Sequence, residues 1–132
     1  MCINWKDQSH LYIGLIDKSN IKTEDIPNFN FKTAPSIYYW DVWQLTLYKN
    51  DSEGNLENSA IGYGCQCTGF DVLLGIKYDY KQRTISFYKN SINLGIAFKN
   101  VPSGLTPIID LGFESGTVQL TNNQKLIEKV FL

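Results

Sequence analysis

The sequence predicts an all-β fold, an antiparallel β-sandwich. Apolar and polar side chains alternate with a period of two around residues 76–88, which gives a strand one apolar face. Turn-forming residues interrupt short apolar stretches at intervals of about eight to twelve residues, as expected for a sandwich of about nine strands. The 132 residues contain no internal repeat, low-complexity tract or linker, so we expect a single domain spanning residues 1–132.

The chain begins with a strand followed by a long connection. Residues 11–16 are predicted as a short apolar strand, in which Gly14 indicates a close backbone approach or a twist. Residues 17–36 are polar, contain two prolines and are predicted as a loop. Structureless loops of this length are often functional.

Residues 37–48 are predicted as one strand, with Trp43, Leu45 and Leu47 on its core face. A polar connector with a turn at 53–55 follows, and residues 60–68 are predicted as a glycine-punctuated strand.

Residues 69–98 predict two successive hairpins. A turn at 80–82 leads to a strand on which Ile85 and Phe87 share one face. A second turn at 89–91 leads to a strand at 94–98. Seven side chains are predicted to lie in the core: Trp43, Leu45, Ile76, Ile85, Phe87, Ala97 and Phe98.

The C-terminal third predicts strands at 105–111 and 116–121, around a turn at 112–116. The last segment, 124–132, fits two structures. Its apolar residues have helical spacing, whereas Ile127, Lys129 and Phe131 alternate as a strand would.

Several segments together resemble the SPRY (B30.2-type) domain family. The central signature is Gly75-x-x-x-Asp79, then Thr84-Ile85-Ser86-Phe87-Tyr88-x-Asn90, then Leu94-Gly95-x-Ala97-Phe98. Weaker matches lie at 12–15, 43–45, 105–108 and 116–120. The resemblance implies a concanavalin-like sandwich that acts as a non-catalytic protein-interaction module.

The chain departs from the family pattern at three places. Phe70 interrupts the glycine-aspartate pair that usually precedes the central strand, and Ser91 replaces a glycine after the hairpin asparagine. Since serine adopts positive φ less readily, this turn is expected to be of another type. The family's opening strands are missing, unless residues 2–5 are their remnant. An uncovered sheet edge would result, and we expect the C-terminal segment to occupy it.

Charge and cysteine content limit the partners. The formal net charge is −1, and 12 basic and 13 acidic residues are spread singly, so we expect neither nucleic acid nor anionic lipid as a partner. No signal peptide or membrane-length apolar run is present. Cys65 and Cys67 share one strand face, and residues two apart in a strand rarely meet the geometry of a disulfide. We therefore expect free thiols and an intracellular location, cytoplasmic or nuclear.

The sequence contains few residues that could form a catalytic or metal-binding site. His10 is the sole histidine, so no nucleophile–base pair or metal cluster is expected. Asp71 and Asp79 could be paired as glycosidase carboxylates, but each fits better as a turn or strand-end residue. We therefore expect no enzyme activity, no metal and no cofactor.

Aromatic residues crowd positions 38–43, and two interpretations remain open. Tyr38 and Trp40, on the opposite parity to Trp43, either pack under the long loop or contact a partner.

The family resemblance implies a partner-binding surface built from the loops at 17–36, 49–59, 99–104 and 112–115. The residues expected to contact a peptide or a folded protein there are Asn20, Tyr38, Tyr39, Trp40, Asn50, Phe113 and Glu114. The expected role is that of an adaptor, or of the substrate-recognising part of a ubiquitin ligase, within a larger polypeptide or complex. The alternative is a lectin-like sandwich, in which Trp40 or Tyr38 stacks on a sugar ring.

Overall fold

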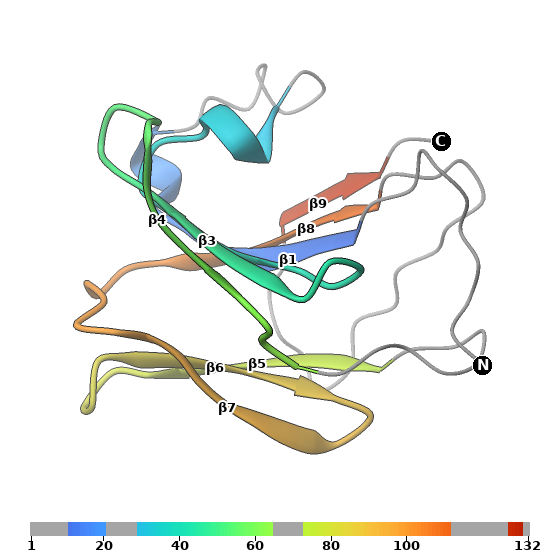
Figure 1. Cartoon of the computed structure of the whole chain (residues 1–132). Helices are drawn as coiled ribbons and strands as arrows, with labels where there is room; N and C mark the ends of the chain where they lie inside the picture. Colours follow the sequence, from blue (N-terminus) through green and yellow to red (C-terminus); the bar gives the residue numbers. More distant parts are fainter. Residues whose placement is uncertain (1–10, 21–28, 65–72, 112–126, 131–132) are drawn as a thin grey trace.

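The computed structural model describes residues 11–20, 29–64, 73–111 and 127–130. Two sheets face each other (Figure 1). The larger has the strand order β4-β3-β2-β1-β8-β9, and the smaller has the order β5-β6-β7. The strands are β1 (Leu11–Ile16), β2 (Ile37–Asp41), β3 (Thr46–Asn50), β4 (Leu56–Ile61), β5 (Leu74–Asp79), β6 (Thr84–Lys89), β7 (Ile92–Lys99), β8 (Thr106–Leu111) and β9 (Ile127–Val130). Two 3₁₀ turns, η2 (Lys18–Asn20) and η4 (Phe31–Thr33), follow β1. The predicted β-sandwich is confirmed, and all strand pairs are antiparallel except β8–β9.

The main core lies between the two sheets. Ile13 and Leu15 of β1 and Trp40 of β2 pack in one cluster with Ile85 and Phe87 of β6. Alternation along each strand sends every second side chain into this layer. Of the seven predicted core residues, Ile85 and Phe87 are fully buried, and the other five are partly buried against the same cluster.

A second cluster covers the outer face of the six-stranded sheet. Phe31 of η4 lies over Tyr39 at a ring distance of 5.1 Å and over Tyr12 at 5.4 Å. Ile16 and Ile37 complete this layer with neighbouring side chains. Both faces of β2 are therefore buried, one by the small sheet and one by the segment before it.

Asn50 fixes that segment in place from the end of β3. Its Nδ2 lies 3.1 Å from the carbonyl oxygen of Phe31 and 2.9 Å from that of Ala34. The side chain of Asn30 caps η4 by accepting from the backbone N–H of Lys32 at 2.9 Å. The two Asn50 bonds satisfy buried carbonyl groups, which would otherwise be costly.

The predicted close approach at Gly14 is confirmed. A Cβ at this position would lie 2.1 Å from the carbonyl oxygen of Tyr38 and 2.6 Å from Tyr39 Cβ. Only glycine lets β2 pass this closely beside β1.

The prediction of one strand over residues 37–48 is wrong. The chain turns after Asp41, whose Oδ1 accepts the Gln44 N–H at 3.1 Å, and Leu45 has a φ of 55°. The result is the β2–β3 hairpin, in which Trp40 faces Leu47. No glycine, proline or asparagine marks this turn, and Asp41 is the one turn-forming residue that the sequence offered.

The other strands and turns also differ from the predicted boundaries at some positions. The turn at 53–55 is confirmed, with Gly54 at a φ of 85°. The strand predicted at 60–68 overlaps β4 only at residues 60 and 61, because β4 spans Leu56–Ile61 and residues 62–64 are not in a strand. β7 begins at Ile92 rather than at residue 94. The C-terminal ambiguity is resolved as a strand, because β9 pairs with β8. The predicted strand at 116–121 and Phe70, which interrupts the family's glycine-aspartate pair, lie outside the described residues.

The β6–β7 turn also differs from expectation. Asn90 has a φ of 51° and Ser91 a φ of 70°, so both central residues are left-handed. A two-residue hairpin loop with positive φ at both positions is the type I′ geometry, which matches the strand twist. Serine occupies the usual glycine conformation here rather than changing the turn.

Candidate functional site

Four connections gather at one end of the sandwich, which we call the loop end: residues 17–20 and 29–36, 51–55, 80–83, and 100–105 (Figure 1). Strand register explains the gathering, because Ile16 at the end of β1 pairs with Ile37 and Thr106. The rings of Tyr38 and Phe98, 5.3 Å apart, join the two sheets there. Three of the four loops expected to bind a partner therefore meet. The fourth follows Leu111, at the other end of β8, and lies outside the described residues.

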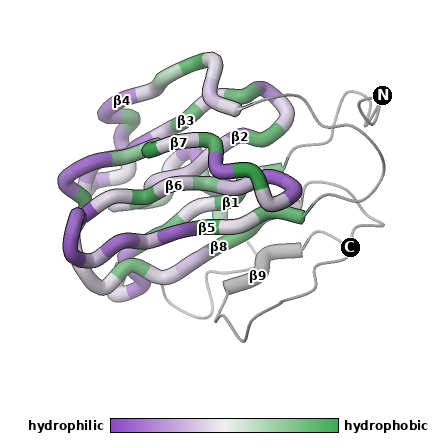
Figure 2. The backbone as a smooth tube through the Cα atoms, turned by 90° about the horizontal axis from the view of Figure 1, so that it is seen from below, coloured by the Kyte–Doolittle hydropathy of each residue, from purple (hydrophilic) through white to green (hydrophobic). Residues whose placement is uncertain are grey.

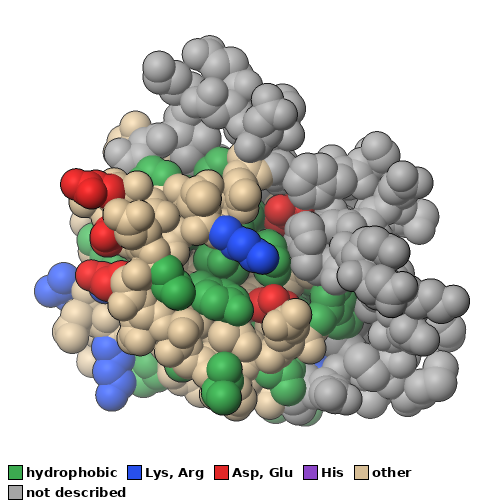
Figure 3. Space-filling model, turned by 45° about the horizontal axis from the view of Figure 1, so that its top comes forward, with side chains coloured by type: hydrophobic (Ala, Val, Ile, Leu, Met, Phe, Trp, Pro, Cys, Tyr) green, Lys and Arg blue, Asp and Glu red, His purple; other side chains and the backbone are tan. Residues whose placement is uncertain are grey.

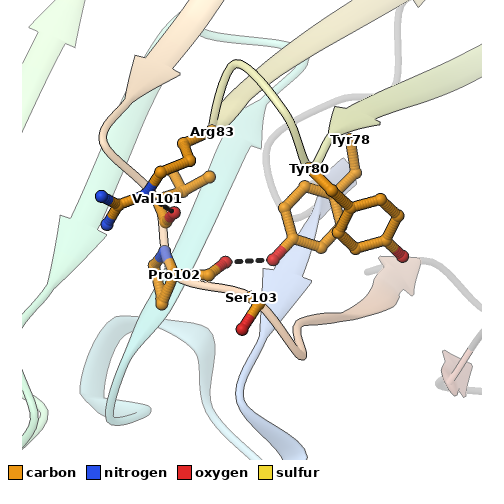
Figure 4. A pocket seen from close by; sticks show the side chains of 6 residues that line it. All are labelled: Tyr78, Tyr80, Arg83, Val101, Pro102 and Ser103. Atoms are coloured by element: carbon orange, nitrogen blue, oxygen red, sulfur yellow. Dashed lines mark hydrogen bonds between the residues drawn. The ribbon is translucent and has the colours of Figure 1, made fainter.

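A pocket of about 390 Å³ opens between two of these connections (Figure 4). Its lining comes from the β5–β6 turn and the β7–β8 connection: Tyr78, Tyr80, Arg83, Val101, Pro102 and Ser103. The rings of Tyr78 and Tyr80 lie 4.5 Å apart on one side. In Figure 4 the guanidinium of Arg83 lies on the other side, beyond Val101 and Pro102, and points away from the rings.

Hydrogen bonds hold the two connections together. The Tyr78 hydroxyl donates to the carbonyl oxygen of Pro102. Arg83 Nε donates to the carbonyl oxygen of Val101 at 3.1 Å, and the Val101 N–H donates back to the Arg83 carbonyl at 3.0 Å. Burial raises the pKa of Tyr78, so its hydroxyl stays protonated and can donate at neutral pH. The pocket walls are thereby fixed before any ligand arrives.

Two lysines lie close to Arg83 along the chain or across the sheet. Lys81 lies in the same turn as Arg83, and Lys99 ends β7 beside Thr84. The nearest carboxylate in the turn, Asp79, is engaged in accepting the backbone N–H groups of Lys81 and Gln82. The β5–β6 turn is strongly hydrophilic in Figure 2. Elsewhere charges of both signs are interspersed over the face shown in Figure 3.

The aromatic and amide residues expected to contact a partner are buried, and that expectation is corrected. Tyr38, Tyr39, Trp40 and Asn50 have exposed fractions of 7%, 2%, 0% and 2%. Tyr38 and Trp40 face the intersheet core, and Tyr39 packs under η4. Asn50 donates to a carbonyl oxygen of η4. These aromatic residues are packed, but not on the faces that the sequence predicted, because the packing interpretation put Tyr38 and Trp40 under the long loop.

The remaining expected contacts are placed only in part. Asn20 ends η2 at the loop end. Phe113 and Glu114 lie outside the described residues.

Sequence reasoning missed the pocket residues. The loop at 99–104 was expected to bind, but Tyr78, Tyr80 and Arg83 were assigned only to the hairpin. The available signal was Tyr80, a large aromatic side chain in a turn that carries two cations, and it is 68% exposed. Pairing that turn with residues 101–103 required the fold.

Sites of other kinds are few within the described ranges. Among these residues no three histidine, cysteine, aspartate or glutamate side chains form a group able to hold a metal. No helix among them is long and apolar enough to span a membrane. His10 and Asp71 lie outside these ranges.

Comparison with known proteins assigns the family. The model of the SPRY domain matches residues 2–126, which is the whole chain apart from Met1 and the last six residues. This range includes residues 2–5, the segment considered as a remnant of the opening strands. No curated protein and no solved structure matches the chain. The fold, the central signature and this match agree: the chain belongs to the SPRY domain family, whose members are non-catalytic protein-interaction modules.

Proposed function

We propose that this SPRY domain binds a short peptide or a folded partner protein through its loop end, without catalysing a reaction. The observation that carries the proposal is the preformed pocket between the β5–β6 turn and the β7–β8 connection. An exposed tyrosine and an arginine at its rim match the side chains that dominate binding energy in protein interfaces. Turns fixed by hydrogen bonds suit recognition with little rearrangement.

In the cell the domain would serve as the recognition part of a larger polypeptide or complex. An adaptor or the substrate-recognising part of a ubiquitin ligase fits a non-catalytic module of this size. Three cysteines without a plausible disulfide pairing support an intracellular setting.

The lectin-like alternative loses the two aromatic residues on which it was based. Stacking on a sugar ring requires an exposed aromatic face, whereas Trp40 is fully buried and Tyr38 packs against Phe98. We therefore do not propose carbohydrate as the ligand.

A peptide array and a glycan array, probed in parallel with the 132-residue chain, test the proposal. We expect binding to a subset of peptides and to no glycan. Tyr80→Ala should weaken peptide binding, because this exposed ring contributes to the pocket and not to the core. Ile61→Ala is the matched control, since Ile61 is 87% exposed and ends β4 away from the loop end. Binding to glycans alone, or to no peptide, would contradict the proposal.

A further inference from the structure

The ligand chemistry of the pocket follows from its lining, and this inference rests on the proposed function. We infer that the pocket selects an acidic peptide that places a carboxylate on Arg83 and an adjacent proline or aromatic side chain against Tyr78, Tyr80 and Pro102.

The guanidinium of Arg83 is oriented and available. Its Nε is held by the carbonyl oxygen of Val101, and its two terminal nitrogens point away from the rings of Tyr78 and Tyr80 (Figure 4). The residue is exposed, so these nitrogens can be reached by a partner. Among the residues that the structure describes, no aspartate or glutamate forms an ion pair with it. A guanidinium presents paired donors that match a carboxylate, and fixing the side chain in advance reduces the entropy lost on binding.

The surrounding charge favours an anionic partner. Lys81 and Lys99 flank Arg83, while the Asp79 carboxylate is turned into its own hairpin turn. The local field therefore attracts acidic segments and repels basic ones.

The wall of the pocket across from Arg83 accepts a ring. Tyr80 lies against Tyr78 and is 68% exposed, and Pro102 faces the two rings across the pocket. The Tyr78 hydroxyl is already bonded to the Pro102 carbonyl, so these rings offer mainly apolar faces. Aromatic-lined grooves of this kind bind proline and aromatic side chains in extended peptides.

Three fluorescein-labelled eight-residue peptides test the inference by fluorescence anisotropy. One carries Glu-Glu-Pro-Phe at its centre, the second has glutamine in place of each glutamate, and the third has alanine in place of proline and phenylalanine. We expect the first to bind at least about tenfold more tightly than either of the others, which corresponds to the loss of one charged contact or one buried ring. Its affinity should fall as salt is raised, because the contact is partly exposed.

Arg83→Gln should abolish the preference for glutamate over glutamine, because glutamine keeps a side-chain donor for Val101 but removes the charge. Lys77→Gln is the control: it makes the same charge change on the outer face of β5, outside the pocket lining, and should alter affinity less than about twofold. Thermal melting of each variant checks that the fold is kept. Tyr80→Ala provides a second variant, expected to remove the preference for proline-phenylalanine over alanine.

Equal affinity for the glutamate and glutamine peptides, or an unchanged preference in Arg83→Gln, would overturn the inference. If peptides selected on the array still bind the chain in that case, the proposed function stands and only the acidic specificity fails. If no array peptide binds, the proposed function itself fails.

Discussion

At the scale of single residues, Tyr63 connects the two sheets. Its hydroxyl accepts the Phe87 N–H at 3.1 Å and donates to the carbonyl oxygen of Gly95 at 2.6 Å, while its own carbonyl accepts from Trp40 Nε1 at 3.2 Å. The β6–β7 register shifts between Ile85 and Ser86 and again between Ser86 and Tyr88, so Phe87 has no partner on β7. The tyrosine hydroxyl thus supplies the hydrogen bond that the irregular ladder does not.

Replacing Tyr63 with phenylalanine should lower the free energy of unfolding by about 1–3 kcal/mol, because the buried N–H of Phe87 loses its acceptor. Urea denaturation followed by tryptophan fluorescence measures the change. Tyr88→Phe is the control, since the hydroxyl of Tyr88 accepts only from the exposed Asn93 and its loss should cost little. Equal effects of the two substitutions would contradict the role assigned to Tyr63.

Phe87 is fully buried between Trp40 and Tyr63, at ring distances of 5.6 Å and 6.1 Å. Phe87→Ala should destabilise the protein by about 3–5 kcal/mol, the transfer loss plus the cavity that remains. Ile96→Ala, on an exposed site of β7, is the comparison and should cost far less. An unchanged denaturation midpoint for Phe87→Ala would show that β6 is out of register.

The raised pKa of Tyr12 predicts that the protein loses stability at high pH. Burial, and then the negative charges of Asp41 and Asp110, raise its pKa from 10.0 to about 12. Since the folded state disfavours tyrosinate, the stability contribution is complete below pH 10 and is lost as pH rises toward 12. We expect the free energy of unfolding to fall over this pH window, and to fall less in the Tyr12→Phe variant than in the parent chain. Denaturation at a series of pH values measures it, and parallel curves for the two proteins would contradict it.

At the scale of elements, the β6–β7 hairpin is strained at Ser91. Its φ of 70° is costly for a residue with a Cβ, whereas Asn90 tolerates φ > 0 and its Oδ1 also accepts the Leu73 N–H at 3.0 Å.

Ser91→Gly should therefore raise the unfolding free energy by up to about 1 kcal/mol. Asn90→Gly is the contrasting variant: it relieves less strain and loses the bond to Leu73, so it should not stabilise. Differential scanning calorimetry distinguishes the two. A lower melting temperature for Ser91→Gly than for the parent chain would show that this turn has a different conformation in solution.

At the scale of the whole molecule, the C-terminal strand β9 lies at one edge of the six-stranded sheet. Among the strands that the structure describes, β8 would be the edge of the six-stranded sheet without β9. β9 pairs with it in parallel, with Ile127 opposite Ile108 and Lys129 opposite Asp110. The C-terminal segment thus occupies an open edge, as the sequence led us to expect. An uncovered edge presents unpaired backbone groups to other chains.

Deleting residues 124–132 should expose the edge of β8 and cause dimerisation or aggregation, which size-exclusion chromatography with light scattering detects. Deleting only residues 131–132 leaves β9 intact and serves as the control. A truncated chain that remains monomeric and equally stable would show that β9 is not needed to cover this edge.

Much of the fold was predictable where alternation and turn chemistry agree. The β5–β6 hairpin, with Ile85 and Phe87 inward, follows from period two and from the Asp79 turn. The β2–β3 turn was not predictable, because Leu45 adopts positive φ without being glycine or asparagine. The burial of the aromatic residues expected at the binding surface was not predictable for a related reason. Burial of both faces of β2 depends on a distant segment, η4, that local sequence does not place.

The sequence by itself determined the all-β class, the central hairpins and the SPRY family, because these depend on local spacing and on residues close together in the chain. The tertiary structure alone decided which aromatic residues are core and which are exposed. It placed Tyr39 under Phe31 and left Tyr80 at the rim of a pocket with Pro102. The physical reason is that burial depends on contacts between distant segments. Such contacts follow from how strands pair and sheets stack, which the pattern within one strand does not specify.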